Sequence, residues 1–109
     1  MTEDSEVLVQ HILQSIAYIE EYVKDKSYQE FETSVQFQDS VLRRLEIIGE
    51  AVKHLSDKFK GDYPHLPWKK IAGMRDILIH EYFGVDLELA WTVVEKDLPF
   101  LKQELQKVI

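Results

Sequence analysis

Three side chains that could take part in chemistry lie close together in one segment, GMRDILIHEYFGVD (73–86). Arg75 offers a bidentate clamp for an anion, His80 an imidazole that titrates near neutral pH, and Tyr82 a phenol. On a helix, Asp76 would lie one turn before His80, where its carboxylate could accept a hydrogen bond from one ring nitrogen and orient the other. The segment therefore predicts a site that binds an anion and moves a proton.

This set of groups favours phosphodiester chemistry over acyl transfer. The chain has no cysteine for a Cys–His pair, and the segment has neither a serine nucleophile nor a Gly-rich loop for phosphates. RNA supplies its own nucleophile, the 2′-hydroxyl, so an imidazole that accepts its proton and a guanidinium that stabilises the charged phosphorus centre would suffice. No metal or other cofactor is expected, because the chain has no cysteine ligand and its four histidines do not pair at helical spacing.

Cleavage by this route needs an acid for the leaving 5′-oxygen as well as a base, whereas one chain supplies a single motif histidine. A twofold dimer would bring two copies of Arg75 and His80 to one cleft. We therefore expect a homodimer with a composite site. Its dry centre would come from the apolar neighbours of the motif, Ile77, Leu78, Ile79 and Phe83.

The elements that would position this segment are helices. Apolar residues recur every three or four positions, and nothing resembles a strand pair or a repeat. The expected fold is an all-α, up-and-down bundle of four to five helices in one domain, residues 1–109. Helices are predicted at about 4–24, 34–59, 68–84 and 86–108, with a short turn or helical connector at 27–31 and a loop at 60–68.

Individual residues within these helices lead to further predictions. Gly49 lies in the apolar stripe of the second helix and should let a neighbouring helix approach closely. Pro99 must kink or divide the last helix. Glu46 and Glu50 lie on a polar stripe, and a solvated face with pairs at helical spacing is favoured over a catalytic role, so both are left out of the candidate site.

Charge is distributed unevenly along the chain. The formal net charge is −7, which argues against a general phosphate-binding surface. Residues 1–32 hold eight acids and two bases, whereas residues 53–75 hold six bases and two acids. One end of the molecule could therefore be locally positive, with Lys69 and Lys70 as candidates for RNA binding, although solvated surface lysines are the simpler explanation.

The segment WKKIAGMRDILIHEYFGVDLELAWTVVEKDLPFL (68–101) closely resembles the signature region of the HepT-like toxins, a branch of the HEPN superfamily. The family pattern of Arg, a polar residue, His and Tyr is met by Arg75, Asp76, His80 and Tyr82. RRLEIIGEAVKHLS (43–56) is similar to the family's second helix, and KDLPFL to its C-terminal element. The resemblance covers most of the chain and shows no departure at the motif positions.

This resemblance implies a HEPN-like helical bundle, a homodimer with a shared cleft, and a metal-independent endoribonuclease. In such a family the enzyme is the toxin of a toxin–antitoxin pair of the type VII-like class, with RNA such as tRNA or mRNA as substrate. The partner implied is an MntA-like nucleotidyltransferase antitoxin that neutralises the toxin by AMPylation of the motif tyrosine, here Tyr82. Catalytic roles would fall to Arg75 and His80, with Asp76 in support.

Two other readings stay open. The same residues could belong to a non-catalytic helical dimer that binds a nucleotidyltransferase partner or a nucleotide. They could also belong to a purely structural bundle, since an arginine five residues before a histidine on an apolar helix is more often an interface pair. No membrane partner is expected, and the absence of cysteine and of a basic, apolar leader favours the cytoplasm.

Overall fold

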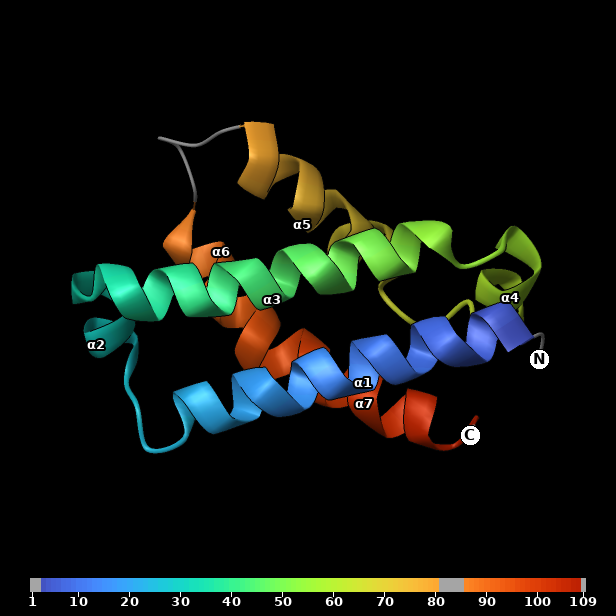
Figure 1. The fold of residues 1–109 in the computed structure, drawn as a ribbon, viewed down its shortest axis with the longest axis horizontal. Helices are drawn as coiled ribbons and strands as arrows, with labels where there is room; N and C mark the ends of the chain where they lie inside the picture. Colours follow the sequence, from blue (N-terminus) through green and yellow to red (C-terminus); the bar gives the residue numbers. More distant parts are fainter. Residues whose placement is uncertain (1–2, 81–85, 109) are drawn as a thin grey trace.

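Two long helices, α1 and α3, run antiparallel beside each other and form the frame on which the other elements pack (Figure 1). The computed structural model describes the backbone of residues 3–80 and 86–108, and the side chains of residues 4–75 and 86–108. Within these ranges every regular element is helical, so the predicted all-α class is confirmed. The elements are α1 (Glu3–Val23), α2 (Tyr28–Thr33), α3 (Val35–His54), α4 (Asp57–Asp62), α5 (Trp68–His80), α6 (Leu87–Thr92), the π-helical turn η1 (Val93–Asp97) and α7 (Leu98–Gln106).

The buried face of α1 follows from the spacing of its apolar residues. Val9, Ile12, Ile16 and Ile19 are at most 1% exposed, as their three- and four-residue spacing predicts. They form one core with the apolar sides of α3 and α7. Each such side chain stabilises the fold by roughly 1.5–3 kcal/mol when fully buried. The burial of these apolar side chains alone therefore accounts for the pairing of α1 with α3.

The predicted second helix is wrong at its C-terminal end. It was expected to continue to Phe59, whereas α3 stops at His54 and Leu55 is extended (φ −66°, ψ 140°). The Ser56 hydroxyl then accepts a hydrogen bond from the Phe59 backbone N–H at 3.0 Å, which caps the new helix α4. Leu55 and Phe59 are both buried across the break. The apolar stripe therefore continues although the helix does not, which is why periodicity alone missed the cap.

The last predicted helix is divided near Pro99, as expected. α6 and α7 are joined by η1, where the Leu98 backbone N–H bonds to the carbonyl of Val93, five residues earlier. Proline has no N–H to offer the carbonyl four residues before it, and a π-helical turn accommodates that loss without ending the helix. Leu101 and Leu105 of α7 are fully buried beyond this point. None of the described helices combines the length and apolar character needed to span a bilayer.

Candidate functional site

The helix that carries the motif, α5, is anchored at its start. The Trp68 indole Nε1 donates to the carbonyl oxygens of Lys60 and Tyr63, at 3.2 and 2.9 Å. Trp68 is 8% exposed and packs against Phe59 of α4. These contacts tie the first turn of α5 to α4, so the helix begins at Trp68 as the sequence predicted. The direction in which α5 leaves this point decides where its functional residues lie.

Of the predicted catalytic and modified residues, Arg75 is the one whose side chain the structure describes. It lies on α5 and is 29% exposed. Residue 80 ends the described part of α5, but the side chains of Asp76 and His80 lie outside the described residues, as does Tyr82. The predicted Asp76–His80 hydrogen bond therefore stays a prediction. The same holds for the apolar side chains expected at a dimer interface, namely Ile77, Leu78, Ile79 and Phe83.

Gly49 brings α3 against α5 beside Arg75. A Cβ placed on Gly49 would lie 2.8 Å from the Cβ of Arg75 and 3.0 Å from the carbonyl oxygen of Ile71. Real Cβ atoms essentially never approach a neighbour as closely as the first of these distances. Glycine costs about 1 kcal/mol relative to alanine within a helix. The predicted role of Gly49 is confirmed, because its missing side chain makes room for the backbone and Cβ of α5.

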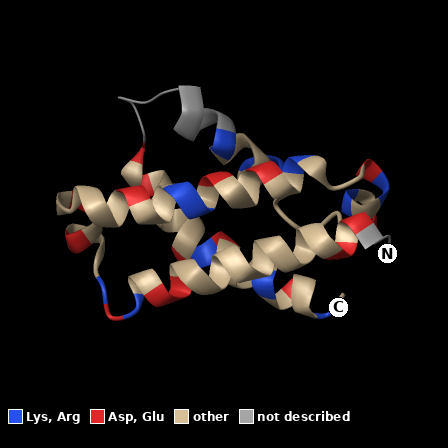
Figure 2. Ribbon diagram, viewed as in Figure 1, with Lys and Arg blue, Asp and Glu red and all other residues tan. Residues whose placement is uncertain are grey.

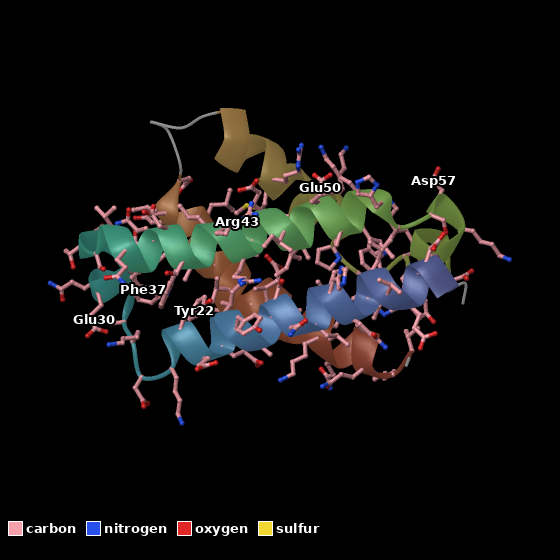
Figure 3. All side chains as sticks on the ribbon, in the orientation of Figure 1. Tyr22, Glu30, Phe37, Arg43, Glu50 and Asp57 are labelled. Carbon is pink, nitrogen blue, oxygen red and sulfur yellow. The ribbon has the colours of Figure 1, made fainter. Side chains whose placement is uncertain are left out.

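The next residue along α3, Glu50, connects Arg75 to a histidine. Its Oε2 forms an ion pair with Arg75 Nε, and its Oε1 lies 3.0 Å from His54 Nε2. Glu50 projects from the side of α3 turned toward α5 (Figure 3). Glu50 bears out the expected pair at helical spacing through His54, and its side chain is 44% exposed, but its ion pair with Arg75 on a second helix was not predicted. The signal that could have found it is its place directly after the packing glycine and one turn before His54.

A pocket of about 320 Å³ opens around this network. Arg43 on its wall pairs with Glu46 at 3.3 Å, one turn before Glu50 on the same helix. Its wall thus combines arginine, glutamate and histidine with apolar groups from α1 and α3. The lining residues are Leu8, His11, Arg43, Glu46, Ile47, Glu50, Ala51, His54 and Arg75.

The two lysines predicted to bind RNA occupy different environments. Lys70 forms an ion pair with Asp97 of η1 at 2.9 Å, which ties α5 to the C-terminal helices. Lys69 lines a separate hollow with Lys53 and Lys60. Basic residues are visible around α4 and the first turns of α5 (Figure 2). Three of the six bases of residues 53–75, Lys69 among them, therefore line one hollow.

The Arg75 network can hold an anion and orient polar groups without a metal ligand set. An arginine carries five N–H donors, so the ion pair through Nε does not by itself exhaust its capacity to bind a phosphate. Across the part of the chain whose side chains are described, no three His, Asp or Glu side chains gather closely enough to hold a metal ion. The fold and the site together define an all-helical protein with an arginine–carboxylate–imidazole network at a surface pocket.

Comparison with known proteins places this architecture in a family. Residues 12–108 match the family described as Ribonuclease HepT-like. The chain is 55% identical over 109 residues to "Gamma-glutamylcyclotransferase and putative RNase" of Methanocaldococcus jannaschii, a match that covers all of this chain and 49% of that protein. It is 41% identical over 100 residues to "Probable ribonuclease HepT" of Thermococcus cleftensis, with 92% and 91% of the two chains covered.

A further relative from Methanocaldococcus jannaschii, named "Putative RNase", is 40% identical over 105 residues and 96% of each chain. No solved structure matches the chain. The chain spans about half the length of the first of these relatives and nearly the full length of the other two. This protein belongs to the HepT-like ribonuclease family.

Proposed function

We propose that this protein is a metal-independent endoribonuclease and the toxin of a toxin–antitoxin pair. The observation that carries the proposal is the position of Arg75 at a polar pocket, where Gly49 and Glu50 fix it from the neighbouring helix. Membership in the HepT-like ribonuclease family supports phosphodiester cleavage as the reaction. RNA then supplies the attacking 2′-hydroxyl, and the protein needs to bind, polarise and transfer protons.

In the proposed reaction, Arg75 binds the non-bridging oxygens of the scissile phosphate and stabilises the charge that develops on them. His80 accepts the proton of the 2′-hydroxyl as that oxygen forms a bond to phosphorus, and Asp76 orients its imidazole. The bond between phosphorus and the 5′-oxygen then breaks, and the leaving oxygen takes a proton from an acid. The products are a 2′,3′-cyclic phosphate and a 5′-hydroxyl.

A second His80, from the twofold-related chain of a homodimer, is the acid that this reaction requires. Two motif histidines would then flank one phosphate, one as base and one as acid. The proposal is supported by the course of α5, whose outer end leads away from the α1–α3 pair (Figure 1). Mixing wild type with an excess of inactive His80→Ala chains would lower the activity per wild-type chain if the site is composite.

The antitoxin in this proposal is an MntA-like nucleotidyltransferase that transfers AMP from ATP to Tyr82: the phenol oxygen loses its proton and bonds to the α-phosphorus, and pyrophosphate leaves. The modification would place bulk and negative charge beside the residues that bind the RNA phosphate, and repulsion would block substrate entry. Mass spectrometry of the toxin after incubation with ATP and such a partner tests this directly. A Tyr82→Phe chain should not gain the mass of AMP and should stay toxic in the presence of the partner.

The central experiment compares wild type with His80→Ala on total RNA in the presence of EDTA, followed by analysis of the fragment ends. Cleavage by wild type alone, with 2′,3′-cyclic phosphate ends, is the expected result. Cleavage by both chains would remove His80 from the mechanism. Cleavage by neither would favour a non-catalytic helical dimer that binds a nucleotidyltransferase partner or a nucleotide.

A further inference from the structure

A second hollow, of about 500 Å³, lies on the surface between α3, α4 and α5. We call it the lysine groove, and it is lined by Lys53, Lys60, Trp68, Lys69, Ala72 and Gly73. Three of these six residues are cations and none is an acid, in a protein whose net charge is −7. The groove also adjoins the first turn of α5, where the helix dipole adds positive potential. The charge of the described residues that line it is thus opposite to that of the molecule as a whole.

Gly73, in the groove, has no packing explanation among the residues whose side chains the structure describes. Glycine destabilises a helix interior relative to alanine, so a glycine in the middle of α5 calls for a reason. Gly49 has one, since a Cβ there would collide with α5. A Cβ placed on Gly73 would meet no atom of the described residues within 4 Å. Open space over a helical glycine at the floor of a cationic groove is what the close approach of a ligand to the backbone requires.

The lysine groove shares a face of α5 with position 80, whereas Arg75 lies about 120° around the helix from Lys69 and lines the other pocket. At about 100° per residue, positions 73 and 80 lie about 40° and about 20° around the helix from position 69. With a rise of 1.5 Å per residue, Lys69 and position 80 are separated by roughly 16 Å along the axis, the length of about three to five nucleotides. The groove is therefore in line with the position of the predicted catalytic histidine.

We propose that the lysine groove binds the phosphate backbone of single-stranded RNA next to the scissile bond. The inference rests on the proposed ribonuclease function and extends it to the path of the substrate. Lys60 and Lys69 neutralise phosphates a few nucleotides away from the cleaved one, and the strand crosses α5 at Gly73, where no side chain holds it off. The groove concentrates positive charge along this path, which explains how an acidic protein can bind a polyanion.

RNA is a better occupant than an apolar protein partner. A protein interface has charged residues depleted at its centre and aromatic residues enriched. Half of the residues that line the lysine groove are lysines, and its one aromatic side chain, Trp68, is 8% exposed with its indole N–H already bonded to backbone carbonyls. Single strands, in contrast, are gripped through their phosphates by Lys and Arg in a positive groove.

The first test measures binding without cleavage. The probe is a fluorescein-labelled oligouridine whose 2′-hydroxyls are methylated, so that it has no attacking group, and anisotropy is followed at several salt concentrations. Lys60→Gln and Lys69→Gln should each reduce the slope of log Kobs against log salt by about 0.7, and the double variant by about twice that. Lys24→Gln is the matched control, because Lys24 is an exposed lysine outside the groove, and its slope should equal that of wild type.

The second test uses Gly73→Ala, which should raise the stability of the fold and lower the affinity for the probe. Alanine should raise the melting temperature, since it favours the helix and its Cβ has room. The same Cβ should weaken binding of the probe several-fold, because it stands where the strand crosses α5. Gly61→Ala, on α4 and equally free of neighbours within 4 Å, is the control and should leave binding unchanged.

The outcomes separate this inference from the proposed function. If wild type cleaves RNA but the lysine variants keep the wild-type salt slope, the groove is not the path of the strand and the ribonuclease assignment stands. If Gly73→Ala binds as tightly as wild type, the strand does not cross α5 there and the inference is overturned. If wild type neither cleaves RNA nor binds the probe, both proposals fail. Weaker binding by the groove variants alone supports the inference.

Discussion

Glu50 on α3 and Arg75 on α5 form an ion pair across the point where Gly49 lets the two helices meet. The carboxylate also bonds to His54 on its own helix, at 3.0 Å. Glu50 is therefore held from two sides and in turn holds the Nε of Arg75. This arrangement fixes the direction from which the guanidinium enters the pocket, and in the proposed reaction Glu50, although 44% exposed, is a positioning residue.

Replacing Glu50 with Gln should lower RNA cleavage by about ten- to a hundredfold, because a misplaced guanidinium no longer meets the phosphate correctly. Stability should change by no more than about 1 kcal/mol, since both partners are partly exposed. The measurement is single-turnover cleavage together with urea unfolding. The matched control is Glu46→Gln, because Glu46 lines the same pocket but pairs with Arg43. Equal losses in the two variants would contradict a specific role for Glu50.

Replacing Arg75 with Lys should reduce cleavage roughly a hundredfold while leaving the helical content unchanged. Lysine keeps the positive charge but cannot present two parallel donors to a phosphate, and it cannot reproduce the contact from Nε to Glu50. Cleavage kinetics and far-UV circular dichroism measure the two effects. Full activity in the lysine variant would show that a point charge is enough, and the bidentate role of Arg75 would be withdrawn.

Replacing Gly49 with Ala should destabilise the protein by about 1–3 kcal/mol, because the new Cβ overlaps the Cβ of Arg75 and crowds the carbonyl of Ile71. Urea unfolding measures the loss. Gly61→Ala is the control, since its Cβ would meet nothing described within 4 Å and alanine favours the helix. A Gly49→Ala chain as stable as wild type would mean that α5 can move away from α3 at little cost.

Acid should weaken one contact between the α4–α5 loop and α7. The hydrogen bond from His65 lowers the pKa of Glu104 below its ordinary value, and a bond from Lys107 acts in the same direction. A carboxyl with a lowered folded-state pKa stabilises the fold above its unfolded-state pKa, and that contribution is lost as the pH falls through the folded-state value. The stability difference between wild type and Glu104→Gln should therefore shrink between about pH 6 and about pH 3. A difference that is constant with pH would exclude the ionised form of Glu104 as its source.

The parts of the fold that were predicted correctly depend on local patterns. The buried faces of α1 and α7, the start of α5 at Trp68 and the division near Pro99 all follow from spacing, proline chemistry and helix signals within a few residues. The end of α3 was missed because two local signals disagreed. Apolar spacing continued to Phe59, while Ser56 favoured a new N-cap, and the cap decided the structure.

The candidate site could be predicted only in part, because it depends on contacts between residues far apart in the sequence. Arg75 was recognisable from its segment, but its partner Glu50 lies 25 positions earlier and reaches it because Gly49 brings two helices together. Spacing along one helix places Glu50 near His54 but carries no information about a second helix. In the same way, adjacent lysines in the sequence separate in space, with Lys70 paired to Asp97 and Lys69 in the lysine groove.

The contact at Gly49 has a consequence for how this protein can change by mutation. Every other amino acid adds at least a Cβ. No single substitution at this position is therefore expected to be neutral. A library that varies all of α3 should show tolerance at exposed Asp39 and near-complete intolerance at Gly49, ten residues later on the same helix. Loss of function at a residue with no functional group would then mark a steric requirement, and it would be easy to mistake for a catalytic one.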